Sequence, residues 1–332
     1  MISPAFPSSN VPIVFATDQS YALYFSVCLQ SLFVHSNDTV NYDLLVFEEG
    51  LSKHTKENLL SIIQTKQNFS LRFFSLKEEM QKYNERTFYS QSHFSRAMYF
   101  RLFIPALLKK YTKVIYLDID IILLADIAEL FSTDITKFCI AGYIEPTQRT
   151  RLFISDYINS GVLVMNLEQI NKTDLLNKVV GILKKYQHLS CPDQDVLNML
   201  FSGKICPLSV SWNFCWHFSL QDFKRTSDFY EAEKIIKKIK IPKLIHYTSG
   251  EKPWNYPEKE FACLWWEYAQ QLSFYSEIKN KAAQDQLEWL KKQYDNYLEF
   301  QKTIYYWLYR RWNDLRKYDF PFLHPSYFFK NK

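Results

Sequence analysis

The sequence predicts an α/β fold with a mainly parallel central sheet and helices on both faces. Strand-like and helix-like segments alternate along about the first 270 residues, which is typical of a parallel sheet covered on both sides. In addition, the run at residues 114–124 is apolar except for Asp118 and Asp120. An apolar run of that length is expected to be buried, as the strands of such a sheet are.

The elements follow in chain order from apolar runs of strand length and from apolar residues at helical spacing. Strands are expected at 11–16, 42–48, 69–75, 113–118, 138–143, 160–166, 205–209 and 243–247. Helices are expected at 20–35, 52–66, 92–109, 173–188, 193–201 and 257–272. In the second of these helices, Leu59, Ile62 and Ile63 supply the apolar stripe. A last helical pattern runs from Ser276 to about Lys317.

Asp118 and Asp120 are the polar residues of the apolar run. On an extended strand, residues i and i+2 point to the same side, so both carboxylates would face one point while Ile119 faces the other way. Buried carboxylates are rare unless something pairs with them, and a divalent cation would keep both ionised. The alternative is structural, with one acid capping a helix and the other paired to a lysine. We favour the metal site.

Residues 243–254 supply a second polar group, because a short strand carries His246 and a turn with Gly250 and Lys252 follows. An imidazole beside two carboxylates suits an ion such as Mn²⁺ better than Ca²⁺, which prefers oxygen ligands. Bare glycine backbone next to a lysine suits a diphosphate. Taken singly, His246 would more often be a hydrogen-bonded core histidine, and Lys252 a solvated surface charge.

Glycine is scarce, with six residues in the chain. Their positions exclude the Gly-x-Gly-x-x-Gly loop of dinucleotide-binding proteins and the phosphate-binding P-loop. A bound nucleotide would therefore be held by side chains and a metal.

Together these segments resemble glycosyltransferase family 8, retaining enzymes that include the bacterial galactosyl- and glucosyltransferases of lipopolysaccharide and lipooligosaccharide cores. The resemblance runs from about Val11 to Trp254 and keeps the family's motif order. It rests on six segments: 13–21, 95–102, 116–120, 157–167, 192–198 and 246–254. Six ordered motifs are far more specific than any one alone. The resemblance implies the GT-A type of nucleotide-sugar-binding fold.

The resemblance also implies the residues of a UDP-sugar site. Ala16 and Asp18 would contact uracil, Tyr21 would stack nearby, and Asn159 would lie in the sugar-binding segment. The full set of implied donor-binding residues is Ala16, Asp18, Tyr21, Arg101, Asp118, Ile119, Asp120, Asn159, Gly250 and Lys252. The implied metal ligands are Asp118, Asp120 and His246, with Mn²⁺ as the cofactor and Mg²⁺ as a substitute.

The segment Pro-Asp-Gln-Asp at 192–195 would lie beneath the reacting sugar carbon, which makes Gln194, Asp193 and Asp195 the implied catalytic residues. A double displacement would need a carboxylate nucleophile. Attack on the same face would need only the Gln194 amide oxygen as a stabilising dipole. The sequence leaves both routes open, and we favour the same-face route. Asp193 has a structural alternative as a helix N-cap, since an apolar helical run follows it.

The implied function is metal-dependent, retaining transfer of galactose or glucose from UDP-galactose or UDP-glucose to a saccharide or glycolipid acceptor. It would serve lipopolysaccharide, lipooligosaccharide or other cell-surface glycan synthesis. Glu145 and His93 match positions on the acceptor side, although Glu145 is equally consistent with a loop charge.

Three alternatives compete with this function. One is a transferase of protein or capsule glycosylation, and another is a non-catalytic sugar-nucleotide binder. The third is an Asp-nucleophile phosphatase, which also places Asp-x-Asp after an apolar strand. That class expects Thr or Val two residues beyond the second Asp, where Ile122 stands, and it leaves His246 unexplained.

Composition and length suggest a cytoplasmic protein with two parts. No apolar run reaches 18 residues, and the first ten residues lack the basic and apolar regions of a signal peptide. Six scattered cysteines without Cys-x-x-Cys suit reduced thiols. We expect residues 1–272 to form the catalytic domain and residues 273–332 a helical, basic and aromatic tail.

Residues 302–332 differ in composition from the rest of the chain. They hold seven Lys/Arg and two Asp/Glu, a net charge of 7 − 2 = +5 that equals the excess of the whole chain, and eleven aromatic residues. This combination favours contact with an anionic membrane surface, here the inner face of the cytoplasmic membrane. The alternatives are a helix packed on the catalytic domain or a dimer contact. Nucleic acids also bind basic, aromatic segments, but nothing else in the chain favours such a partner.

Overall fold

The computed structural model describes residues 2–83, 87–88, 95–145, 154–186, 189–215, 242–248 and 250–316, with side chains described to residue 310. The chain divides into two compact units, Met1–Ile278 and Lys279–Lys332. The predicted division, into a catalytic domain at 1–272 and a tail at 273–332, also assigns a function to each part. It therefore stays a prediction.

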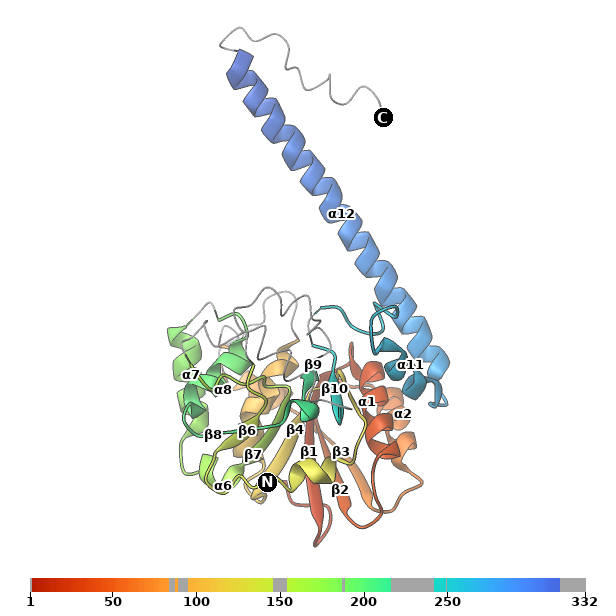
Figure 1. Ribbon diagram of the computed structural model, residues 1–332, viewed down its shortest axis with the longest axis vertical. Coiled ribbons are helices and arrows are strands. Elements are labelled where there is room, and N and C mark those ends of the chain that lie inside the picture. The colour runs from red at the N-terminus through yellow and green to blue at the C-terminus, as the bar shows by residue number, and fades with distance from the viewer. Residues whose placement is uncertain are drawn as a thin grey trace. The chain divides into compact units, whose positions relative to one another are not determined.

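A large sheet lies at the centre of the first unit (Figure 1). Within the described residues its strand order is β3-β2-β1-β4-β7-β6-β8. The strands are β1 (Asn10–Asp18), β2 (Asn41–Glu49), β3 (Phe69–Ser75), β4 (Lys113–Leu117), β6 (Ile140–Gly142), β7 (Val162–Asn166) and β8 (Ile205–Pro207). Only β7 runs antiparallel to its neighbours, β4 and β6, among these strands. The prediction of a mainly parallel sheet is confirmed.

A second, smaller sheet consists of β5 (Ile121–Leu123), β10 (Leu244–His246) and β9 (Phe214–Cys215), in that order. The apolar run at 114–124 therefore forms two strands, because β4 ends at Leu117 in the large sheet and β5 enters the small one. The strand predicted at 113–118 is confirmed, but β5 was not predicted.

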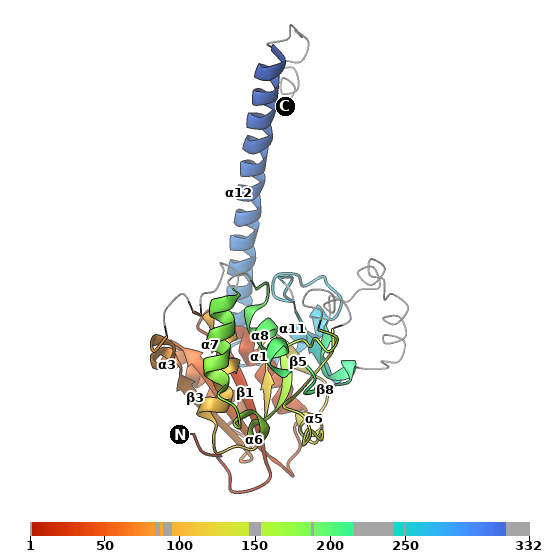
Figure 2. The same cartoon turned by 90° about the vertical axis from the view of Figure 1, so that its left-hand side faces the viewer.

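Helices cover both faces of the large sheet (Figures 1 and 2). Alternate side chains of β1 point to opposite faces. Phe15 packs against Phe25 of α1, with ring centroids 4.8 Å apart, whereas Val14 and Ala16 belong to a core cluster on the other face. On the Phe15 side lie α1 (Ala22–Val34), α2 (Lys53–Ile63) and α11 (Ala262–Gln270).

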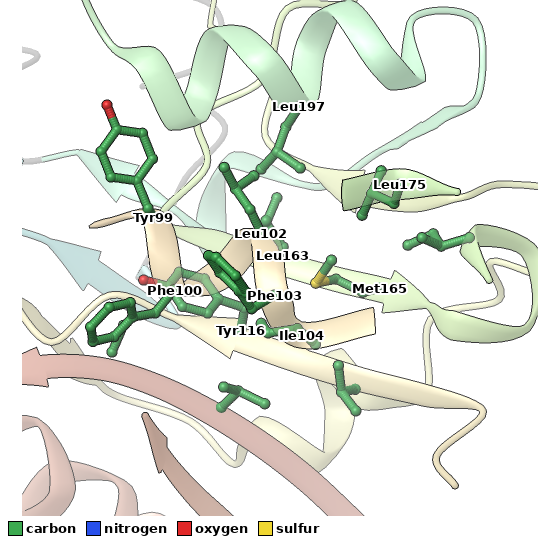
Figure 3. Packing of buried hydrophobic residues seen from close by; sticks show 14 of the residues in the cluster. Tyr99, Phe100, Leu102, Phe103, Ile104, Tyr116, Leu163, Met165, Leu175 and Leu197 are labelled. Atoms are coloured by element: carbon green, nitrogen blue, oxygen red, sulfur yellow. The ribbon is translucent and has the colours of Figure 1, made fainter. Parts of the chain in front are cut away.

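The cluster on the Val14 side is built from side chains of β4 and β7 and of the helices above them (Figure 3). These helices are the 3₁₀ helix η1 (Arg96–Phe103), α4 (Ile104–Leu107), α7 (Leu175–Lys185) and α8 (Pro192–Phe201). The remaining short elements are α3 (Lys77–Gln81), α5 (Ile127–Phe131), α6 (Leu167–Ile170) and η2 (Val210–Trp212). Tyr116 and Leu163, from neighbouring strands, are almost completely buried in this cluster.

The single helix predicted at 92–109 is wrong in its form. Residues 96–103 are a 3₁₀ helix and α4 is a separate short helix; residues 92–94 lie outside the described residues. Pro105 has no N–H, so it cannot donate to the Arg101 carbonyl as a continuous α-helix requires. The Ile104 N–H donates to that carbonyl instead, which tightens the turn.

The other predicted helices are confirmed within a few residues. The last helical pattern forms α12 (Tyr275–Arg316). Among the helices of the described residues, none is both long enough and apolar enough to cross a membrane.

Candidate active site

Asp118 and Asp120 lie in the turn that leads from β4 to β5. Strand β10 pairs antiparallel with β5, with His246 opposite Ile121, and the Tyr247 N–H donates to the Asp120 carbonyl at 2.9 Å. This pairing brings His246 Nε2 to 3.2 Å from Asp120 Oδ1 and 3.6 Å from Asp118 Oδ2. One ligand atom of each residue lies within 4.8 Å of the others. The three predicted metal ligands therefore converge.

The reason for this convergence differs from the predicted one. Neither Asp118 nor Asp120 belongs to a strand, so strand alternation does not align them. The turn between the two sheets brings their carboxylates together, and Ile119 between them is buried.

Gly161 provides the space beside these ligands. Its carbonyl accepts the Asp118 N–H at 2.7 Å. A Cβ atom at position 161 would lie 2.1 Å from His246 Cε1 and 2.6 Å from Asp118 Oδ2, closer than real atoms approach. Two carboxylates and one imidazole form a donor set that suits Mn²⁺ and similar divalent ions. The residues present therefore fit a divalent metal, and Asp118, Asp120 and His246 form a candidate site for it.

Lys252 lies beside the same ligands. Its ammonium contacts Asp120 Oδ2 and donates to the Tyr247 carbonyl at 2.7 Å. Burial by itself would raise the pKa of Asp120, but the charged ammonium of Lys252 and the contact with His246 together outweigh it and lower that pKa below its usual range. Asp120 is therefore an ionised ligand at neutral pH. Gly250 is exposed, with open space around it, and diphosphate contacts of Gly250 and Lys252 stay predictions.

Arg101 joins the metal ligands to the predicted catalytic segment. Its buried guanidinium donates to Asp118 Oδ1 at 2.7 Å, and its Nε lies 3.1 Å from Asp193 Oδ2. The same guanidinium donates to the Ser160 carbonyl at 2.6 Å and lies 4.4 Å from the centre of the Tyr116 ring. Arg101 therefore fixes two carboxylates from different elements, and its contact with a donor stays a prediction.

The residues just before β7 lie at the edge of the large sheet that carries Asp118. Because β7 is antiparallel to β4, with Val162 opposite Leu117, the residues that precede it lie beside Asp118. Asn159 is buried here, and its amide donates to Glu145 Oε1 at 2.8 Å. Glu145 is therefore a buried, hydrogen-bonded side chain and not a solvated loop charge. His93 lies outside the described residues.

The first turn of α8 buries Asp193, Gln194 and Asp195. Burial raises the pKa of Asp193 above its usual range, against the opposing charge of Arg101. Gln194 Oε1 accepts the Ser160 N–H at 2.9 Å. Asp193 and Gln194 therefore face the segment that carries Gly161.

Asp195 turns to structural partners instead. Its Oδ1 accepts the Tyr157 hydroxyl at 2.6 Å, and its Oδ2 accepts the N–H of Cys191 at 3.2 Å. Cys191 is the N-cap residue of α8, so the alternative that Asp193 caps this helix is wrong.

The residues predicted to contact uracil lie at the carboxyl end of β1, at the same edge as the carboxyl end of the parallel strand β4. Ligands of such sheets bind at this edge. Asp18 Oδ1 accepts the N–H groups of Ser20 and Tyr21 at 2.8 and 3.2 Å, which stabilises the turn into α1. Tyr21 is 37% exposed, and Ala16 is buried. Contacts of these residues with a nucleotide stay predictions.

Sequence reasoning missed two buried asparagines. Asn198 clamps α8 onto the chain before β7, because its side chain accepts the Ile158 N–H at 2.7 Å and donates to the Ile158 carbonyl at 2.9 Å. It lies one helical turn after Gln194 in the recognised motif, so its spacing was an available signal. Asn213 contacts both Asn159 and His246. It lies outside the six segments, and nothing in its local pattern distinguishes it.

The profile of the family described as "Glycosyl transferase family 8" matches residues 12–258. This chain belongs to that family. General stress protein A of Bacillus subtilis is 27% identical over 254 residues, which cover 73% of this chain and 87% of that protein. The lipopolysaccharide 1,2-glucosyltransferase of Escherichia coli is 33% identical over 172 residues, which cover 48% of this chain and 50% of that protein.

Solved structures agree on the fold. The apo structure of the bifunctional glycosyltransferase WbbM has a TM-score of 0.73 at 25% identity, covering 84% of this chain and 53% of that one. Galactosyltransferase LgtC, in complex with donor and acceptor sugar analogs, has a TM-score of 0.67 at 23% identity, covering 79% and 96%. This second likeness concerns the fold alone, and the predicted GT-A fold is confirmed.

Substitution of Gly161 tests the metal site directly. Because the added methyl of Gly161→Ala would overlap His246 and Asp118, we expect Mn²⁺ affinity to fall by at least about tenfold, with circular dichroism unchanged. Mn²⁺ titration followed by electron paramagnetic resonance measures this affinity. The matched control is Gly181→Ala in α7, where an added Cβ meets nothing within 4 Å. Unchanged Mn²⁺ affinity in Gly161→Ala would contradict the placement of the site.

Proposed function

We propose that this protein is a metal-dependent, retaining hexosyltransferase. It transfers galactose or glucose from UDP-galactose or UDP-glucose to a saccharide or glycolipid acceptor. The observation that carries the proposal is the convergence of Asp118, Asp120 and His246 beside the Asp193–Gln194 segment. Arg101 connects the two groups, in a chain that belongs to glycosyl transferase family 8.

Asp118, Asp120 and His246 would hold the cofactor, Mn²⁺ or in its place Mg²⁺. When bound, the ion supplies positive charge to the donor diphosphate and so assists departure of UDP. Lys252, already beside Asp120, adds a fixed positive charge for the same oxygens.

The nucleotide would bind along the carboxyl edge of β1 and β4. There Ala16, Asp18 and Tyr21 would receive the uracil, while Ile119 and Gly250 would offer backbone to the ribose and phosphates. Asn159 and Arg101 would line the hexose. These roles follow from the family and from the position of the residues at one sheet edge.

Transfer would proceed on one face of the sugar, with Gln194 as the stabilising dipole. Its amide oxygen accepts the Ser160 N–H, and this hydrogen bond orients the dipole. The Gln194 side chain itself carries no formal charge. The carboxylates a double displacement would need are engaged, Asp193 by Arg101 and Asp195 by Tyr157. This pairing weakens both as nucleophiles and supports the same-face route.

The acceptor side would include Glu145 and His93. A role in lipopolysaccharide or lipooligosaccharide synthesis is supported by the name of the Escherichia coli relative, and protein or capsule glycosylation is the alternative. A cytoplasmic protein held at the inner face of the membrane through its tail would fit such acceptors. Family membership argues against the Asp-nucleophile phosphatase, and release of UDP distinguishes a transferase from a non-catalytic binder.

The metal ligands are tested by Asp118→Asn and Asp120→Asn. Each change removes a negative ligand, so UDP release from a panel of UDP-sugars should fall by at least about a thousandfold, or several kcal/mol of transition-state stabilisation. EDTA should have the same effect, reversibly. Asp38→Asn is the control, since the Asp38 side chain is 86% exposed. Full activity in metal-free buffer would refute the role of the metal.

Retention is tested by the product. From an α-linked UDP-sugar, attack on the same face predicts an α-linked product, because the incoming hydroxyl takes the place that UDP leaves. The coupling constant of the anomeric proton, measured by NMR, reports the linkage. A β-linked product would exclude both the same-face route and the double displacement.

The tail is tested by a truncated protein that ends at Gln301. In the second unit, Tyr305, Tyr306, Trp307 and Tyr309 are all exposed, which suits insertion among lipid headgroups. The truncated protein should keep turnover on a short soluble acceptor but lose flotation with phosphatidylglycerol-containing vesicles. In the full chain each nearby Lys or Arg should add about 1 kcal/mol, and binding should weaken as salt rises.

Folding of the truncated protein is checked by circular dichroism, because α12 crosses the cut. Equal flotation of the two proteins would show that the tail does not anchor the protein to lipid.

A further inference from the structure

A buried chain of hydrogen bonds runs from Glu145 to the metal ligand His246. Asn159 Nδ2 donates to Glu145 Oε1 at 2.8 Å. Asn213 lies next, with 2.9 Å between its Nδ2 and Asn159 Oδ1, and 2.9 Å separate Asn213 Oδ1 from His246 Nδ1. All four side chains are at most 8% exposed, and Asn213 is completely buried. The chain is therefore largely shielded from solvent.

The direction of this chain is set at Asn159. The Gly161 N–H, which can only donate, lies 3.0 Å from the Asn159 side-chain atom that also faces Asn213. That atom must therefore be the oxygen Oδ1. The nitrogen of the same amide then faces Glu145, whose carboxylate accepts it. Two independent partners thus give Asn159 the same orientation.

The orientation of Asn159 determines the proton on His246. Since Asn159 presents an oxygen, Asn213 must turn its NH₂ group toward it, and its own Oδ1 then faces His246. An amide oxygen only accepts, so His246 Nδ1 carries a proton, and in the neutral imidazole Nε2 therefore carries the lone pair. Nε2 is the nitrogen that faces Asp118 and Asp120.

This arrangement opposes what the carboxylates alone would favour. Asp120 Oδ1, 3.2 Å from Nε2, would attract a proton to that nitrogen. A protonated Nε2 would donate a hydrogen bond to Asp120 and present no lone pair to a metal. A partner that holds the proton on Nδ1 therefore decides whether the imidazole is a ligand or only a hydrogen-bond donor.

The small sheet places Asn213 at this position. Asn213 follows η2 and immediately precedes β9, which pairs with β10 so that Cys215 lies opposite His246. The Cys215 thiol, 3.6 Å from Asn213 Oδ1, is also close enough to donate weakly to that oxygen.

We propose that Asn213 is a positioning residue that fixes His246 as the Nδ1-protonated tautomer and so prepares Nε2 to bind the metal. The catalytic relevance of this tautomer rests on the proposed metal-dependent function. The tautomer itself is a property of the metal-free protein. Partners of this kind, which orient a histidine ligand through its other nitrogen, typically contribute 10–100-fold to metal affinity.

The test uses the full chain with ¹⁵N-labelled histidine, free of metal. Long-range proton–nitrogen NMR spectra distinguish the two tautomers, and His246→Gln identifies the His246 signals. At a pH where the wild-type imidazole is neutral, we expect a protonated Nδ1 and an unprotonated Nε2. In Asn213→Leu, which has the same branching and number of side-chain heavy atoms but no acceptor, the proton should move to Nε2, and Mn²⁺ affinity should fall by about 10–100-fold.

Asn213→Asp separates positioning from packing. Its carboxylate still accepts from Nδ1, so this variant should keep the tautomer and most of the Mn²⁺ affinity although it loses the donor to Asn159. Asn166→Leu, which replaces a buried asparagine in another part of the fold, should leave the His246 signals unchanged.

The proposal fails if wild-type His246 carries its proton on Nε2, or if Asn213→Leu keeps both the tautomer and the Mn²⁺ affinity. It also fails if Asn213→Asp loses affinity as Asn213→Leu does. Should Asn213→Leu not fold, the wild-type spectrum and Asn213→Asp still decide. A protein without transferase activity that shows the expected tautomer and affinities would refute the proposed function and leave this inference standing.

Discussion

Asp118 and Asp120 are two like charges in one turn, with side chains only 24% and 16% exposed. Like charges in one turn repel each other, and burial disfavours the charged form of a carboxylate. The fold offsets each with a separate cation, because Arg101 donates to Asp118 at 2.7 Å and Lys252 contacts Asp120. The η1 helix and the chain after β10 are thereby held at the same point. Removing one cation would leave a buried charge without compensation, which is far more destabilising than removing a surface ion pair.

The antiparallel strand β7 explains how a third segment reaches this point. In a purely parallel sheet, the residues at the carboxyl edge all end or follow their strands, as Asp18 ends β1 and Asp118 follows β4. Because β7 is reversed, the residues that precede it lie at that edge, and Ser160 and Gly161 come beside Asp118. The absence of a side chain at position 161 then leaves the space between the ligands open.

The sequence was most informative where the signal was local. Apolar runs located β1, β2 and β4 correctly, and the motif segments predicted that Asp118, Asp120 and His246 belong to one site. Pairing across long separations was less accessible, because the three-residue strand β5 is indistinguishable from a continuation of the apolar run. The direction of β7 is likewise absent from its alternation pattern, since a strand reads the same way in either direction.

Polar residues without a periodic pattern were the hardest to predict. The role of Asn213 depends on its partners, which come from the chain before β7 and from β10, and a single asparagine in a short loop carries no signal of that kind. The break between η1 and α4 was, by contrast, accessible in principle, because Pro105 removes the N–H that a continuous helix needs there.

The small sheet depends on the large one for its stability. Its strands are two or three residues long, and a sheet of that size is not stable by itself in water. The candidate metal site draws Asp118 from the end of β4 and His246 from β10, so an ion held there would cross-link the two sheets. Its binding free energy would then add to the stability of the folded state. The residues that prepare His246 for metal binding would therefore also stabilise the junction between the two sheets. Binding of the metal and stability of the small sheet would then depend on the same side chains.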